Sequence, residues 1–144
     1  KRLLVRDTWQ DQEFDYLKSF LEGYHYDIDI NKIEIQKLTS FLNEKRNFLL
    51  RLLENPVLLE HQTFTETLRT VFHLTEELER RSGVDELPTT DLSHINGDLV
   101  RVYRNISKQW VDYMKYLKTN YPYLFSLAIR TNPFDQEASV IVRK

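Results

Sequence analysis

Four long stretches of this chain place an apolar side chain at every third or fourth position, a spacing typical of amphipathic α-helices. Glycine occurs only three times in 144 residues, and the four prolines, Pro56, Pro88, Pro122 and Pro133, fall between the periodic stretches. Because glycine and proline mark turns, such a distribution indicates few turns and long helices. The sequence therefore predicts an all-α fold.

We expect the four long helices at about residues 8–22, 31–54, 57–82 and 89–119, and a short fifth helix at 120–131. Thr8 is the expected cap of the first helix, Asn31 with Glu34 forms a candidate capping box for the second, and Asn120 would cap the fifth. Short connections make successive helices antiparallel. The prediction is a single helical domain over residues 1–144, an antiparallel four-helix bundle with a short fifth C-terminal helix, followed by a tail at 131–144.

The composition excludes several classes of function. Cysteine is absent, which excludes disulfides, thiolate zinc sites and a cysteine nucleophile. The formal net charge is -2, so no global positive field attracts nucleic acid. No nucleophile elbow, phosphate loop or zincin motif occurs. We therefore expect no catalytic residue, no cofactor and no nucleic-acid partner, and a protein that is not an enzyme.

Histidines beside carboxylates raise the alternative of a metal site inside a helical bundle. The two candidate motifs are "HLTEE" from His73 to Glu77 and "DLSH" from Asp91 to His94. A helix turns about 100° per residue, which places His73 opposite the apolar stripe of its helix and His94 away from its own. We expect solvated histidines that share no centre, and hence no metal ligands. His61 borders an apolar stripe, where a hydrogen-bonded position at the edge of the core is expected.

Two charged residues interrupt apolar stripes. Glu13 lies on the stripe of the first helix and Lys45 on that of the second. They are about equally far from the turn near residues 27–30, so an antiparallel pair of helices would bring them together. The register predicts an interhelical ion pair, although each side chain could instead extend outward to solvent.

The fourth helix carries a basic face opposite its apolar stripe, formed by Arg101, Arg104, Lys108 and Lys115. Such a face can approach the anionic head groups of a membrane or an acidic partner. The alternative is an ordinary solvated helix face.

The segment "YPYLFSLAIR" is apolar in a polar chain. From 123 to 129 a helix would rise only about 10 Å, against a hydrocarbon core of about 30 Å. We therefore expect a helix that docks through Tyr123, Leu124, Phe125 and Ala128, either on the end of the bundle or against another subunit.

Three runs of the sequence, spread over about residues 9–135, resemble one archaeal family. They are "GYHYDIDINKIEIQKLTSFLNEKRNFLLRLLENP", "VFHLTEELERR" and "QWVDYMKYLKTNYPYLFSLAIRTNPFD". The chain is similar to the soluble C-terminal helical domain of two-transmembrane, potassium-channel-like membrane proteins. The basic start "KRLLVR" fits the cytoplasmic flank of a membrane helix.

The resemblance implies a fragment of a longer membrane protein, on the cytoplasmic side of the cell membrane. Its partners would be its own transmembrane pore region and further copies of itself, and its role assembly or the control of gating. Two alternatives stay open, namely a metal-dependent or small-molecule-binding helical-bundle enzyme and a stand-alone adaptor for other proteins.

Overall fold

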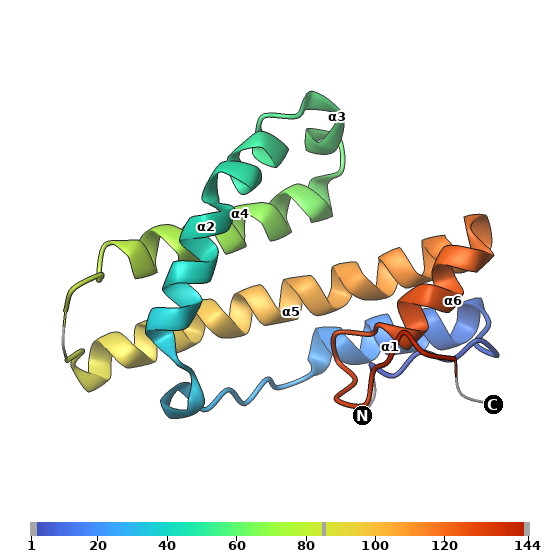
Figure 1. The fold of residues 1–144 in the computed structure, drawn as a ribbon, viewed down its shortest axis with the longest axis horizontal. Helices are drawn as coiled ribbons and strands as arrows, with labels where there is room; N and C mark the ends of the chain where they lie inside the picture. Colours follow the sequence, from blue (N-terminus) through green and yellow to red (C-terminus); the bar gives the residue numbers. More distant parts are fainter. Residues whose placement is uncertain (1–2, 85, 143–144) are drawn as a thin grey trace. The chain divides into compact units, whose positions relative to one another are not determined.

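A computed structural model describes residues 3–84 and 86–142 of the chain. The regular structure in these ranges is helical throughout and contains no strand (Figure 1). The elements are α1 (Asp11–Gly23), the short 3₁₀ helix η1 (Ile30–Lys32), α2 (Ile35–Leu53), α3 (Pro56–Leu59), α4 (Gln62–Glu79), α5 (Thr89–Asn120) and α6 (Pro122–Arg130). The predicted all-α class is confirmed.

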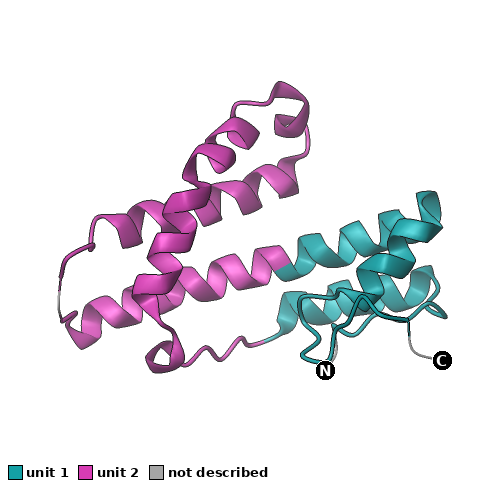
Figure 2. Ribbon diagram, in the orientation of Figure 1, with its two compact units in different colours: residues 1–24, 107–144 teal, residues 25–106 magenta. Residues whose placement is uncertain are grey.

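The chain divides into two compact units (Figure 2). Unit 1 combines residues 1–24 with residues 107–144, and unit 2 is residues 25–106. The long helix α5 contributes its first part to unit 2 and its second part to unit 1. The single domain expected from the sequence stays a prediction.

In unit 2, α2 packs on α4, and the first part of α5 completes the core. The buried cluster is Leu42, Leu74, Leu78, Ile95 and Leu99, surrounded by half-buried isoleucines, valines and a leucine. The buried face of α4 also contains threonines, and the hydroxyls of Thr67, Thr70 and Thr75 bond to carbonyls of their own helix. Thr75 donates to the Val71 carbonyl at 2.8 Å. A hydroxyl paired in this way can be buried without a lasting desolvation cost.

In unit 1, α1 and the second part of α5 lie together. The core residues of this unit are Val5, Phe14, Leu17, Leu21, Val111, Met114, Leu117 and Phe125. Three ion pairs join α1 to α5, namely Lys18–Asp112 at 2.8 Å, Lys115–Asp15 at 2.7 Å and Lys108–Glu22 at 3.2 Å. Because these ion pairs are partly exposed, each contributes little to the free energy of unfolding. Their main effect is on which faces of α1 and α5 lie against each other.

The helix expected at 57–82 is in fact two helices. Asn55 accepts a hydrogen bond from the Val57 amide at 3.0 Å and begins the short α3. The Thr65 hydroxyl then donates to the Leu58 carbonyl at 3.0 Å, so this side chain caps the end of α3. His61 is the exposed N-terminal capping residue of α4, so its predicted place at the edge of the core is wrong.

Three predicted helix caps are also wrong. The Asp29 side chain accepts from the Asn31 amide at 3.2 Å, which makes a 3₁₀ turn, and α2 begins only at Ile35. Gln10, not Thr8, precedes α1, and α5 continues through Asn120. Asn31 and Asn120 bond to other local partners, namely the Asp29 carboxylate and the Tyr116 carbonyl.

Candidate functional site

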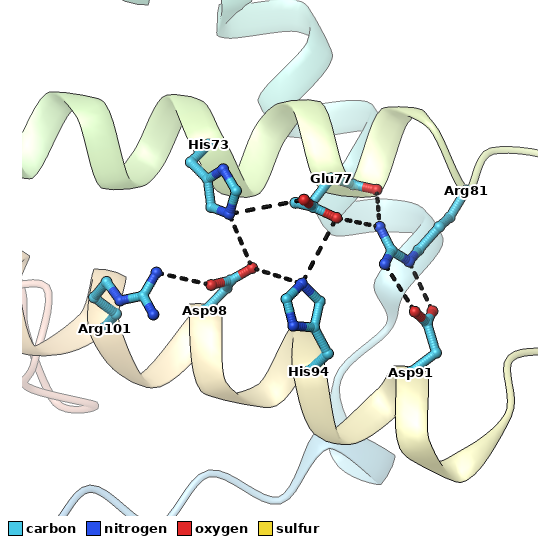
Figure 3. Close-up of polar contacts among 7 residues, drawn as sticks. All are labelled: His73, Glu77, Arg81, Asp91, His94, Asp98 and Arg101. Atoms are coloured by element: carbon cyan, nitrogen blue, oxygen red, sulfur yellow. Dashed lines mark hydrogen bonds and ion pairs between the residues drawn. The ribbon is translucent and has the colours of Figure 1, made fainter.

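Seven charged or ionisable side chains meet between α4 and α5 within unit 2 (Figure 3). We call this group the α4/α5 polar cluster, and its members are His73, Glu77, Arg81, Asp91, His94, Asp98 and Arg101. The first three come from α4 and its C-terminal end, and the other four from α5.

The same spacing recurs on both helices. Glu77 follows His73 by four residues on α4, and Asp98 follows His94 by four residues on α5. Residues four apart lie on one face of a helix, about one turn from each other. Each pair of residues flanks the apolar face by which its helix joins the core of unit 2. The two histidine–carboxylate pairs therefore face each other at the border of that core.

Arg81 holds one end of the cluster. Its guanidinium donates to both carboxylate oxygens of Asp91, each at 2.7 Å, and to the carboxylate of Glu77 at 2.5 Å. It also donates to the Glu77 carbonyl at 2.7 Å. Hydrogen bonds from Arg81 lower the pKa of Glu77 and of Asp91, and the carboxylate of Asp91, followed by that of Glu77, raises the pKa of Arg81.

Asp98 is the buried member, with only 4% of its surface exposed. Its Oδ1 accepts a hydrogen bond from Arg101 at 3.0 Å. Its Oδ2 is buried and has no hydrogen-bond partner. The nearest ring nitrogens are Nε2 of His73 at 3.4 Å and Nε2 of His94 at 3.6 Å.

The two histidines also approach Glu77. Nε2 of His73 lies 3.8 Å from Oε1 of Glu77, and Nε2 of His94 lies 3.8 Å from Oε2. Each imidazole is thus within 4 Å of both carboxylates, and Figure 3 shows the four side chains pointing toward one another. About half of each histidine side chain is exposed.

The expectation that His73 and His94 share no centre is therefore wrong. Leu74, the residue after His73, is 2% exposed and part of the core. The true buried face is rotated toward His73. The repeated histidine–carboxylate spacing on two consecutive helices was the signal in the sequence.

Two further properties of the described residues bear on the site. Across residues 3–84 and 86–142, no group of three or more His, Cys, Asp or Glu side chains is placed so that it could hold a metal ion. Within the same ranges, none of the helices combines the length and the hydrophobicity that crossing a membrane requires.

The residues of the predicted ion pair lie in different units. Glu13, in unit 1, accepts a hydrogen bond from the Gln10 amide at 2.8 Å. Lys45, in unit 2, pairs with Glu44 at 2.7 Å. The Glu13–Lys45 pair stays a prediction.

The four residues of the predicted basic face all have partners within their own units. Arg101 pairs with Asp98, and the guanidinium of Arg104 lies over the ring of Tyr26 at 5.6 Å. The partners of Lys108 and Lys115 are the carboxylates of α1 described above. The binding of lipid head groups by this face stays a prediction.

The four residues of α6 that were expected to dock differ in how far they are exposed to solvent. Phe125 is 5% exposed, and its ring centroid lies 6.5 Å from that of Phe14. Tyr123 is 93% exposed and Leu124 51% exposed, while Ala128 is half-buried. One side of α6 thus enters the core of unit 1, and apolar side chains on another side face solvent.

Unit 1 also has two hollows that open to solvent, of about 680 and 760 Å³. The first is lined by Trp9, Glu13 and Tyr16 among others, and Phe125 lies at the wall of the second.

Comparison with known proteins gives one family. The family model described as "Uncharacterized protein MJ1433, C-terminal helical domain" matches residues 1–130. A relative from Methanocaldococcus jannaschii, "Uncharacterized protein MJ1433", is 48% identical over 139 residues. The match covers 96% of this chain and 56% of that relative, so the chain spans little more than half of the relative's length. No solved structure matches the chain.

Proposed function

The chain belongs to the family of the MJ1433 C-terminal helical domain, and from this premise we propose that it is a non-enzymatic assembly or regulatory domain of a longer protein. Two facts support the proposal: the family is described as a C-terminal domain, and the M. jannaschii relative is much longer than the matched part. We also propose that the helices of this domain form the arrangement that the sequence predicts, an antiparallel four-helix bundle with a short fifth helix.

The observation that carries the assembly role is the exposed apolar side of α6. Tyr123, Leu124 and Leu127 are large apolar residues that face solvent, close together on one short helix. Contiguous exposed apolar surface is typical of interaction sites. We propose that this surface contacts a second copy of the chain, so that the domain forms a homo-oligomer.

Light scattering after size exclusion tests the assembly role. We expect an oligomer for the natural chain and a monomer for the double variant Leu124→Asp, Leu127→Asp, because two carboxylates cannot be buried unpaired in an apolar interface. Val57→Asp is the matched control, since Val57 is an exposed apolar residue of α3 in unit 2. A natural chain that stays monomeric over the whole concentration range would refute the role.

The narrower proposal is that the longer protein is a channel-like membrane protein with this domain on its cytoplasmic side, next to its own pore region. Its support is the resemblance described in the sequence analysis. Fractionation of cells that express the longer protein tests it, and we expect the protein to sediment with the membranes and to need detergent for extraction. Recovery in the detergent-free extract would refute this placement.

A further inference from the structure

We propose that the larger hollow of unit 1 binds a small, soluble phosphate monoester whose organic part is apolar. We call it the α6 hollow, and its volume is about 760 Å³. Its lining comes from residues 5–8 before α1, from Lys118 near the end of α5, and from one face of α6. The inference goes beyond the proposed assembly role and does not depend on it, because Tyr123, Leu124 and Leu127 do not line the hollow.

The charged side chains that line the α6 hollow favour an anion. The cations are Arg6, Lys118 and Arg130, and the carboxylate is that of Asp7. Three cations against one carboxylate leave an excess of two positive charges. A phosphate monoester has a charge of about −1.5 to −2 at pH 7, so one such group balances this excess.

The three cations keep donors available for a ligand. Lys118 donates to the Asp7 carbonyl, and Arg130 donates to the carbonyls of Ser126 and Val140. The side chain of Arg6 has neither a hydrogen bond nor an ion pair to another residue in the described ranges. A lysine ammonium has three N–H donors and a guanidinium has five. These residues therefore retain both their charge and unused N–H groups at the hollow.

Part of the wall of the α6 hollow is apolar. Val5 is 3% exposed and Phe125 is 5% exposed, so both belong to the core of unit 1 as well as to this wall. Pro122 and Ile129 continue the wall along α6. The ammonium of Lys118 lies over the ring of Phe125, 5.3 Å from its centroid. A positive charge thus stands directly beside apolar surface, which suits a ligand with an anionic group next to an apolar one.

The size and the cation types of the α6 hollow indicate the class of ligand. Sites for small molecules have volumes of about 300–1,000 Å³ and combine an apolar lining with a few polar groups. Guanidinium groups match the oxygens of a phosphate in pairs, so Arg6 and Arg130 suit a phosphate ester. Val5 and Phe125 are almost fully buried, and only a molecule that enters the hollow can contact them. A soluble ester does so, whereas the head groups of a flat membrane would meet only the exposed cations.

Isothermal titration calorimetry with hexyl phosphate tests the proposal. We expect one saturable site per chain, with an affinity that falls as the salt concentration rises, because salt screens exposed charges. Hexanol lacks the anionic group and inorganic phosphate lacks the apolar one. Each should bind at least about tenfold more weakly than hexyl phosphate, since each loses one of the two contributions.

Two single variants locate the site. Arg6→Gln and Lys118→Gln should each weaken the affinity for hexyl phosphate by about tenfold, the scale expected when a hydrogen bond to a charged group is lost. Arg51→Gln is the matched control, because it removes the same charge from an exposed position on α2 in unit 2, and it should leave the affinity unchanged. Circular dichroism verifies that each variant is folded, and Arg6→Gln removes no contact with the described residues.

Several results would overturn the proposal. One is the absence of saturable binding of hexyl phosphate to the natural chain, and another is equal affinity for hexanol. A natural affinity in either folded variant, or an equal loss in the Arg51 control, would place the ligand elsewhere. Sedimentation of the chain with vesicles of phosphatidic acid, without binding of hexyl phosphate, would show that the hollow does not take a soluble ester.

Discussion

A single residue, Arg81, connects the end of α4 to the beginning of α5. It uses its planar guanidinium for a two-pronged contact with Asp91 and uses the same group for Glu77. Most surface ion pairs contribute little, but two-pronged arginine–carboxylate contacts in a network are the exception. Only 21% of the Arg81 side chain is exposed. Loss of this side chain would leave the carboxylates of Asp91 and Glu77 without their main hydrogen-bond partner.

Replacement of Arg81 by glutamine should lower the melting temperature at neutral pH. The pKa values of Asp91 and Glu77 lie below their ordinary values of 3.8 and 4.5 because Arg81 donates hydrogen bonds to them. Groups with a lowered pKa stabilise the fold above their ordinary pKa and lose this effect as the pH falls through the lowered value. The difference from the natural chain should therefore be full at about pH 7 and shrink below about pH 4. Thermal melting at several pH values, with Arg80→Gln as the control for charge, measures it. A difference that is independent of pH would contradict this origin.

Among the elements, α6 shows most clearly which side chain of an apolar segment enters the core. Phe125 is buried against Phe14, whereas its neighbour Leu124 is half-exposed. The variant Phe125→Ala should lower the free energy of unfolding by about 3–5 kcal/mol, as expected for a buried phenylalanine. Leu124→Ala should change it by less than about 1 kcal/mol. Urea denaturation measures both, and equal losses would mean that α6 is packed differently.

The elements also show how far the sequence could predict the fold. Apolar spacing predicted α2, α5 and α6 to within a few residues, because burial of a stripe determines where a helix can persist. It did not predict the break between α3 and α4, where the Thr65 hydroxyl donates a hydrogen bond to the Leu58 carbonyl. The apolar spacing within α4 also did not determine which side of this helix is buried. The expected buried side was rotated about the helix axis by part of a turn from the observed one. The polar cluster was missed for this reason, since it depends on that rotation.

At the scale of the whole molecule, the two ends of the chain belong to one unit. The buried Asn132 donates to the Leu3 carbonyl at 2.8 Å and accepts from the Phe134 amide at 2.9 Å. The sequence predicted a tail at 131–144, and Asn132 lies within that range. A residue near the C-terminus thus satisfies a backbone group near the N-terminus, and both are part of unit 1.

Because Asn132 belongs to unit 1, its replacement by alanine should loosen that unit more than unit 2. The change removes the hydrogen bonds of Asn132 to the part-buried Leu3 carbonyl and Phe134 amide, and the cost of about 1–3 kcal/mol for a fully buried polar group left unpaired is the upper bound for each. Local stability differs between parts of a protein, and hydrogen exchange reports it for each part. We expect faster exchange in α1 and α6, and unchanged exchange in α2 and α4. The control is Asn120→Ala, whose exposed side chain donates to the Tyr116 carbonyl one turn earlier, and it should leave both units unchanged. Equal acceleration in all four helices would show instead that the two units open as a single cooperative block.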